Sequence, residues 1–314
     1  MLIGHQKQWK IIQRMFENKK IPHALLFVGP EKIGKKTFAV EFVKFLNCSS
    51  KNSPCDQCQN CLDIQRKSYP DLIFIQPEKE NEIKISQIRD LIWKLSLKPY
   101  SSSFKVAIID EAHLMNLQAQ NSLLKILEEP KGETFLILIT SRPEFLLPTI
   151  LSRVQTMRFF PVSKDEIKRY FLSNKINPQK ADYLANISLG KPGRVIEFYS
   201  NPEKLEKEKK FFNDFEKILR SGLSFRLKYI QKLLEKQNDS LEEDPKEVLE
   251  IWLRYLREIL ISKIKDKEEN EENANSFSFS QIKKSILLVY STIFFLSTTN
   301  INKKLALENL LVNL

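Results

Sequence analysis

Residues 104–160 read FKVAIIDEAHLMNLQAQNSLLKILEEPKGETFLILITSRPEFLLPTILSRVQTMRFF, and this stretch decides the fold class. Its first apolar run, Val106 to Ile109, is short and rich in β-branched residues, which predicts a buried strand of a parallel sheet. Two acids, Asp110 and Glu111, follow the run directly. Ligands of α/β proteins bind at the carboxyl ends of the strands, so these acids are candidate catalytic residues. The alternative is that they are solvated acids at a strand edge.

The rest of the stretch continues the alternation of helix and strand. Leucines and isoleucines at helical spacing predict a helix from Asn116 to Glu129, which Pro130 and Gly132 end. A second buried strand is predicted over Phe135 to Thr140, and a short helix then leads to Arg153. This order, with polar residues at the strand ends, is typical of a nucleotide-binding α/β domain. Upstream of the stretch we expect a strand over 70–75 and a helix over 82–97.

A phosphate-binding loop lies further upstream. The apolar run Ala24 to Val28 predicts a strand, the segment GPEKIGKKT over 29–37 follows it, and a helix is predicted from there to about Asn47. The segment nearly matches the motif G-x-x-x-x-G-K-[ST], in which backbone N–H groups and a helix N-terminus hold phosphates. Lys35 would reach the terminal phosphates. The candidate nucleotide-binding residues of the motif are Gly29, Gly34, Lys35, Lys36 and Thr37.

The motif departs from its pattern at the hydroxyl that normally holds magnesium. Lys36 stands there, and Thr37 comes one place later. Successive helical residues point about 100° apart, so we do not expect Thr37 to replace the hydroxyl. We expect a degenerate ATP site, where binding of ATP and Mg²⁺ is open and hydrolysis is slow or absent. Thr140, ending the second buried strand, and Arg194, opening a later helix, complete the candidate nucleotide-binding residues.

The four cysteines form one cluster with the spacing C-x6-C-x2-C-x2-C. Four thiolates surround zinc tetrahedrally, and C-x2-C pairs suit that geometry. Free structural cysteines, the alternative, usually occur singly on apolar faces, whereas these lie among polar residues in a segment where Pro54 indicates an irregular loop. The pattern predicts a structural zinc site rather than a secreted disulfide framework. The candidate metal ligands are Cys48, Cys55, Cys58 and Cys61.

The totals describe an ordinary globular chain. The 314 residues suffice for two or three domains, and 42% are hydrophobic and 28% charged. The N-terminus lacks the apolar core of a signal peptide, and no apolar run reaches the roughly 18 residues of a membrane span, so we expect a cytoplasmic protein. The net charge of +11 permits contact with nucleic acid or acidic partners. However, the lysines are spread along the chain, as on a solvated basic surface.

From residue 161 onward strand patterns stop and helical patterns follow, beginning with a capping box of Ser163 and Glu166. The expected domains are an α/β nucleotide-binding domain over 1–160 with a zinc insert at 48–61, a helical lid over 161–202, and an all-α domain over 203–314. Helices are expected in the last domain at 203–221, 223–237, 245–266, 280–297 and 302–313. Lys265 to Asn275 is expected to be a polar linker.

Several segments resemble the clamp-loader AAA+ family of bacterial DNA polymerase III. The most specific are NSLLKILEEP over 121–130 and Leu151-Ser152-Arg153. The resemblance covers most of the chain and is weakest between about 203 and 300. The other resembling segments are His23-Ala24, the cysteine insert, 87–89, 97–100, 109–112 and 305–311.

The resemblance implies a fold, partners and one further site residue. The implied fold is an AAA+ P-loop domain with a parallel sheet, a helical lid, and an all-α collar that joins five subunits in a ring. The implied partners are gamma/tau and delta subunits and, through the complex, the sliding clamp and primed DNA. It also implies that Arg153 is an arginine finger acting in trans. The alternative is a surface arginine paired with a nearby acid.

Three functions stay open. Lys36 at the magnesium position favours a stator subunit with weak or no ATPase of its own. The intact acids Asp110 and Glu111 keep open an active ATPase subunit of the gamma/tau kind. The third function is a zinc-bearing DNA-binding module with a degenerate nucleotide fold.

Overall fold

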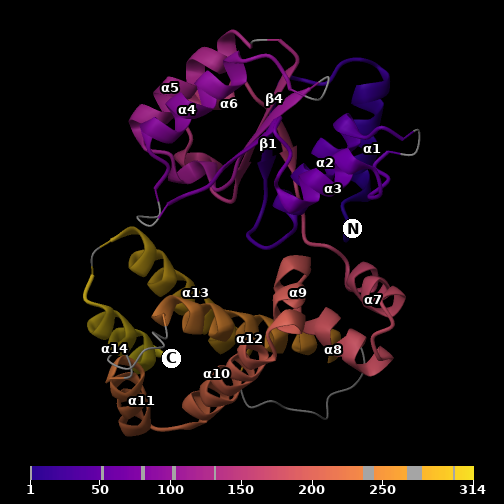
Figure 1. Cartoon of the computed structure of the whole chain (residues 1–314). Coiled ribbons are helices and arrows are strands. Elements are labelled where there is room, and N and C mark those ends of the chain that lie inside the picture. The colour runs from indigo at the N-terminus through magenta and orange to yellow at the C-terminus, as the bar shows by residue number, and fades with distance from the viewer. Residues whose placement is uncertain are drawn as a thin grey trace. The chain divides into compact units, whose positions relative to one another are not determined.

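The chain forms two compact units, Met1–Tyr199 and Ser200–Leu314. The computed structural model describes residues 2–50, 53–78, 82–100, 104–130, 132–235, 244–266, 278–299 and 301–314, and Figure 1 labels its elements. The expected linker, Lys265 to Asn275, lies outside the described residues except for Lys265 and Asp266, which end α12 (Pro245–Asp266). The expected lid segment belongs to the same unit as the α/β segment.

A five-stranded parallel sheet of order β2-β3-β4-β1-β5 forms the centre of the first unit. Its strands are β1 (Ala24–Val28), β2 (Leu72–Ile75), β3 (Lys105–Ile109), β4 (Thr134–Thr140) and β5 (Gln155–Arg158). The first four form where apolar, β-branched runs predict buried strands. The sequence did not predict β5, because only Met157 of its four residues is buried, so it has no apolar run. It lies at the edge of the sheet and pairs with β1.

Helices cover both faces of this sheet (Figure 1). Neighbouring residues of β1 divide between two buried clusters, with Leu26 in one and Leu25 and Phe27 in the other, as the alternation of a strand requires. The Leu26 face packs against α4 (Ile85–Ser96), α5 (Leu117–Glu128) and α6 (Pro148–Leu151). The opposite face packs against α1 (Gln6–Glu17), α2 (Lys35–Asn47) and α3 (Gln59–Arg66). Two short 3-10 turns are η1 (Ala112–Leu114) and η2 (Pro143–Phe145).

Three short helices follow β5: α7 (Lys164–Ser173), α8 (Pro178–Ile187) and α9 (Pro192–Ser200). The predicted capping box begins α7, where the Ser163 hydroxyl accepts from the Glu166 backbone N–H and the Glu166 side chain accepts from Ser163. Their apolar faces form a separate small cluster around Ile167, Phe171 and Val195. Ile3 joins this cluster, so the N-terminal segment is tied to these helices.

The second unit is all-helical. Its helices are α10 (Pro202–Arg220), α11 (Leu223–Glu235), α12, α13 (Phe279–Thr298) and α14 (Lys303–Asn313), close to the expected bounds. The buried cluster centres on Trp252, whose ring stacks on Phe215 with centroids 4.6 Å apart. Stacked aromatic pairs of this kind add to the stability that burial of their area provides.

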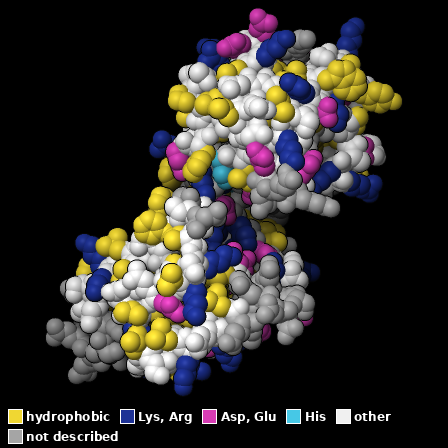
Figure 2. All heavy atoms as spheres, turned by 90° about the vertical axis from the view of Figure 1, so that its left-hand side faces the viewer, with side chains coloured by type: hydrophobic (Ala, Val, Ile, Leu, Met, Phe, Trp, Pro, Cys, Tyr) yellow, Lys and Arg dark blue, Asp and Glu magenta, His cyan; other side chains and the backbone are white. Residues whose placement is uncertain are grey.

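The segment Phe279–Ser297 of α13 is long and apolar enough to cross a membrane by length and composition, although the sequence was not expected to contain such a run. Only 22% of this window is buried. One such helix is weak evidence for a span, and several α13 residues, among them Val289, pack into the buried cluster of the second unit. The face drawn in Figure 2 shows Lys and Arg side chains dispersed among apolar and acidic ones, which agrees with a solvated basic surface.

Candidate nucleotide site and cysteine cluster

A pocket of about 290 Å³ opens at the carboxyl ends of the central strands. It brings together segments far apart in sequence: the loop after β1, the acids after β3, the end of β4, and the start of α9. The sequence-predicted residues that line it are Gly34, Lys35, Lys36, Thr37, Asp110, Glu111 and Thr140. The lining residues that were not named as candidates are Glu31, Lys32 and Ile33, which lie within the predicted phosphate loop, and Ile139, Ser141 and Gly193. The predicted residues Gly29, Arg153 and Arg194 are not among the lining residues.

Lys35 is buried beneath the loop, with only 7% of its surface exposed. Its Nζ donates to the backbone oxygens of Gly29 and Pro30, the latter at 2.7 Å. Burial lowers the pKa of Lys35 to about 8, although the nearby acids Glu31 and Asp110 oppose that shift. A buried ammonium group held by loop carbonyls is positioned to contact phosphate oxygens, since Lys binds phosphate as a point charge.

Lys36 contacts the first of the two acids. Its Nζ lies 3.1 Å from Asp110 Oδ2 and 4.4 Å from the centroid of the Phe74 ring on β2. The Lys36 side chain is 42% exposed and that of Asp110 is 18% exposed. Thr37 also lines the pocket but is exposed. The chain's own ammonium group therefore occupies the position at which a phosphate loop normally places a magnesium-binding hydroxyl.

Asp110 and Glu111 lie together at the end of β3. Glu111 adopts the left-handed conformation (φ 51°), and its backbone N–H donates to Asp110 Oδ1 at 3.1 Å. Burial, then the negative charges of Asp110 and Glu31, raise the pKa of Glu111 above its usual range. A carboxyl group of this kind at a strand end is suited to accept a proton, although acids in structural networks show such shifts too.

The end of β4 carries a small polar network. Thr140 Oγ1 lies 3.2 Å from His113 Nδ1 and accepts from the Arg142 backbone N–H at 3.0 Å. The Ser141 hydroxyl oxygen beside it is shielded from solvent and has no hydrogen-bond partner among the described residues. His113 was not among the candidate residues, and its closeness in sequence to Asp110 and Glu111 is the signal that could have found it.

Helix α9 is attached to the phosphate loop. The Gly193 backbone N–H donates to Lys32 O at 2.9 Å, and Lys32 Nζ contacts Glu197 Oε2 at 2.6 Å. A Cβ on Gly193 would lie 2.8 Å from Lys32 O, so only glycine permits this approach. Arg194 follows directly, and its guanidinium lies 5.0 Å from the centroid of the Phe198 ring. Sequence reasoning found Arg194 but not the glycine beside it that reaches the pocket.

Gly29 and His5 shape the loop from behind. A Cβ on Gly29 would lie 2.6 Å from Phe159 O, so this glycine permits close packing between the loop and the segment after β5. His5 Nε2 lies 2.8 Å from Ile33 O, within the loop. The His5 ring packs edge-on against Phe159 at 5.0 Å. The role of Gly29 is therefore to allow the loop's conformation rather than to line the pocket.

Arg153 lies away from the pocket, directly after α6. Its Nη2 contacts Glu128 Oε1 on α5 at 2.8 Å, and its side chain is 36% exposed. Gln120, buried in α5, fixes the segment before α6 by accepting from Leu147 N at 2.8 Å and donating to Phe145 O at 3.1 Å. The alternative interpretation, a surface arginine paired with a nearby acid, requires an ion pair, and the contact between Arg153 and Glu128 is such a pair. A role in trans stays a prediction.

The four cysteine sulfurs are brought together as one cluster. All four Sγ atoms lie within 4.8 Å of one another, and Cys48 Sγ and Cys58 Sγ are 4.0 Å apart. A tetrahedral zinc site with Zn–S bonds of about 2.3 Å has sulfurs about 3.8 Å apart, so the donors fit such an ion after a small contraction. The prediction of an irregular loop is wrong at its end, because Cys61 lies within α3 and is buried.

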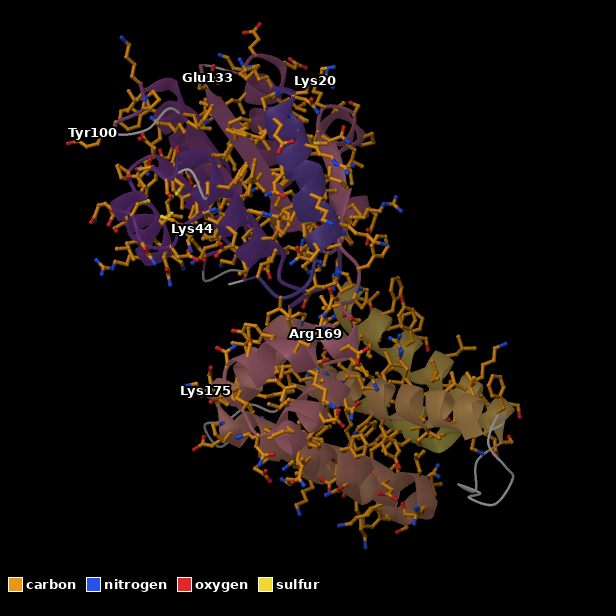
Figure 3. All side chains as sticks on the ribbon, turned by 90° about the vertical axis from the view of Figure 1, so that its right-hand side faces the viewer. Lys20, Lys44, Tyr100, Glu133, Arg169 and Lys175 are labelled. Carbon is orange, nitrogen blue, oxygen red and sulfur yellow. The ribbon has the colours of Figure 1, made fainter. Side chains whose placement is uncertain are left out.

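Contacts around the cysteines hold the cluster on α2. Lys44 of α2, labelled in Figure 3, is buried and contacts Asp56 Oδ1 at 2.7 Å and Glu41 Oε1 at 3.2 Å. Although burial opposes it, hydrogen bonds from the backbone N–H groups of Ser49 and Cys61 lower the pKa of Cys58 to about 6. Cys58 thereby offers the thiolate, which is the form that binds metals, at neutral pH, whereas burial raises the pKa of Cys61 to about 12.

Comparison with known proteins gives one family. The model of the family described as "DNA polymerase III, delta subunit" matches residues 4–163. DNA polymerase III subunit delta' of Bacillus subtilis is 34% identical over 218 residues, which cover 69% of this chain and 66% of that protein. Subunit delta' of Pseudomonas aeruginosa is 38% identical over 134 residues, covering 42% and 41%.

Subunits of the tau and gamma kind also match, over a smaller fraction of this chain than the first delta' subunit does. DNA polymerase III subunit tau of Bacillus subtilis is 36% identical over 168 residues, covering 53% of this chain and 30% of that protein. A solved structure of a gamma-subunit-related protein of Thermotoga maritima aligns over 97% of both chains, with 22% identity and a TM-score of 0.48. The matched region spans about two thirds or less of the length of these curated relatives.

Proposed function

Because the chain belongs to the DNA polymerase III delta-subunit family, we propose that it is a clamp-loader subunit of the delta' kind that hydrolyses ATP weakly or not at all. The observation that carries the second part is the contact of 3.1 Å between Lys36 Nζ and Asp110 Oδ2. The chain has an AAA+ α/β fold, and its place is in a hetero-oligomeric ring with gamma/tau and delta subunits, in the cytoplasm. There the ring loads a sliding clamp onto primed DNA.

A magnesium ion does not fit the residues present at the phosphate loop. The hydroxyl that would hold it is replaced by Lys36, whose positive charge already contacts Asp110. Magnesium ordinarily bridges the β and γ phosphates and neutralises charge that develops during transfer. The loop itself fits phosphates, because its backbone precedes α2 and the Lys35 ammonium lies beneath it. Binding of nucleotide is thus separable from its hydrolysis in this subunit.

The isolated chain should hydrolyse ATP far below the roughly 1–100 s⁻¹ of competent phosphoryl-transfer enzymes. Lys36→Thr restores the missing hydroxyl and leaves Asp110 free of its ammonium partner, so this variant should gain activity. The measurement is steady-state phosphate release by the two purified proteins. Turnover by the natural chain near the competent range would favour the alternative, an active ATPase subunit of the gamma/tau kind. Salt-dependent DNA binding by the chain alone would favour a DNA-binding module.

The second unit serves as the collar that carries assembly. A stripe of α13 exposes Leu287, Tyr290 and Phe294 by 60%, 62% and 54%, at spacings of three and four residues. Such an apolar stripe suits a partner helix. Deleting residues 203–314 should therefore abolish ring formation with gamma/tau and delta chains, while the remaining unit keeps its sheet. Size-exclusion chromatography of the mixed subunits checks this, and assembly that survives the deletion would place the interface on the first unit.

The cysteine cluster holds one structural zinc ion in this proposal. Four thiolates and no open ligand position are the features of a structural rather than catalytic zinc site. Cys48 and Cys61 flank the insert, so the ion would fasten the start of the insert at the end of α2 to α3. Its chemistry is limited to holding these segments.

A further inference from the structure

The phosphate-loop pocket carries its own cation. Its lining includes three basic residues, Lys32, Lys35 and Lys36, and three acidic ones, Glu31, Asp110 and Glu111. Lys36 lies against Asp110 at 3.1 Å, where a magnesium-dependent loop would have a hydroxyl and a hydrated ion. We propose that Lys36 serves in place of the divalent cation, so that this pocket binds a nucleoside triphosphate without Mg²⁺. This inference rests on the nucleotide site assumed in the proposed function.

The Lys36 ammonium is held in position from two sides. Asp110 Oδ2, at the end of β3, contacts the ammonium nitrogen at 3.1 Å. The centroid of the Phe74 ring, on the neighbouring strand β2, lies 4.4 Å from the same nitrogen. A cation over an aromatic face is attracted by the ring, which restricts the conformations of the Lys36 side chain. The Lys36 Nζ therefore stays beside the acid at the mouth of the loop rather than extending into solvent.

The same ammonium group can transfer to a phosphate. With 42% of its side chain exposed, the Lys36–Asp110 pair is screened by water and weak, so exchanging the carboxylate for a triphosphate oxygen costs little. Lys35 beneath the loop and Lys36 at its mouth would then neutralise two charges of the polyphosphate. A Mg²⁺ ion entering this pocket would have to stand beside Lys36, and like charges repel.

The pocket wall also contains a hydroxyl group, that of Ser141, without a hydrogen-bond partner among the described residues. Ser141 lines the pocket, and its hydroxyl oxygen is shielded from solvent. Buried polar groups are nearly always paired, so such an atom in a pocket wall points to a ligand that pairs with it. An ammonium group carries one positive charge and does not supply the divalent charge that Mg²⁺ places between the β and γ phosphates, so the bound nucleotide would remain intact and act as a structural occupant.

The test is equilibrium binding of a non-hydrolysable ATP analogue to the full chain, measured once with excess EDTA and once with excess Mg²⁺. The natural chain should bind in EDTA and at least about tenfold more weakly in excess Mg²⁺, because Mg²⁺ binds the polyphosphate in solution and the complex would bring a second cation against Lys36. Folded Lys36→Thr should bind at least about tenfold more weakly in EDTA, the effect of one lost charge contact, and should recover in Mg²⁺. Lys36→Arg keeps the charge and should keep the natural chain's preference for nucleotide without Mg²⁺. Lys20→Thr, an exposed lysine remote from the pocket in sequence, is the matched control for loss of charge and should behave as the natural chain.

Four results would overturn the inference. These are a natural chain that requires Mg²⁺, a natural chain that binds no analogue in either condition, a folded Lys36→Thr that still binds well in EDTA, and a folded Lys36→Thr that Mg²⁺ does not rescue. None of them touches the clamp-loader assignment, which is decided by assembly and clamp loading. Circular dichroism melting of each variant confirms that the comparison is made between folded proteins.

Discussion

Replacing Arg153 by alanine in this chain alone should leave the mixed ring assembled and slow ATP hydrolysis at one neighbouring site by about 10³-fold or more. An arginine finger stabilises the charge that develops on a γ-phosphate, and its planar, permanently charged guanidinium suits that task. The other sites still turn over, so total ATPase should fall only in part, while clamp loading falls more. The measurement is single-turnover hydrolysis and clamp loading by rings that contain the variant.

The stability of the Arg153→Ala variant distinguishes an arginine finger from an arginine that only stabilises the fold. The Arg153–Glu128 pair is exposed by 36% and 51%, and exposed pairs contribute only about 0–1 kcal/mol, so Arg153→Ala should unfold at nearly the natural denaturant concentration. Glu128→Ala removes the partner and keeps the arginine, and it should preserve hydrolysis. Arg169→Ala, on the surface of α7 and labelled in Figure 3, is the matched control. Arg153→Ala rings that load clamps at the normal rate would show that Arg153 only pairs with Glu128.

Protein purified without added metal should contain about one zinc ion per chain, and Cys58→Ser should lose most of it. Structural zinc contributes about 10–16 kcal/mol of binding free energy in zinc-finger peptides, so losing one of four thiolates should weaken binding by several orders of magnitude. The expected structural result is local: residues 48–61 become open to proteolysis. The sheet should stay folded, because the buried clusters on its two faces include no cysteine.

Elemental analysis and limited proteolysis check the zinc prediction together. Ser49→Ala is the matched control, since Ser49 is exposed and contributes only its backbone N–H to Cys58. Fully reduced, folded protein without zinc would contradict the assignment. It would leave the cluster as four free thiols beside the contact between Lys44 and Asp56.

The sheet and its polar strand ends were predictable because local patterns determine them. The runs at β1, β3 and β4 are apolar and short, and parallel strands buried on both faces require such runs. β5 was missed because a single buried residue gives no pattern, and its pairing with β1 depends on the rest of the fold. The helical part of the cysteine segment was missed because α3 is short and its one cysteine, Cys61, was interpreted only as a ligand.

The candidate site was only partly predictable, because sequence motifs give residues but not their contacts. The motif indicated that Lys36 replaces a hydroxyl, but the contact with Asp110 joins residues 74 positions apart and depends on strand order. The attachment of Gly193 to Lys32 likewise spans the whole α/β segment. Arg194 was chosen because it opens a helix, whereas its position over Phe198 follows from packing within α9.

Clamp loading with and without this chain tests the central claim most directly. Gamma/tau and delta subunits, a sliding clamp and primed DNA are mixed, and loaded clamps are counted with the chain omitted, added back, or replaced by the 203–314 deletion. We predict loading only when the full chain is present, from a stable complex in which the chain is one subunit. Equal loading in its absence, or an added chain that does not join the complex, would contradict the assignment.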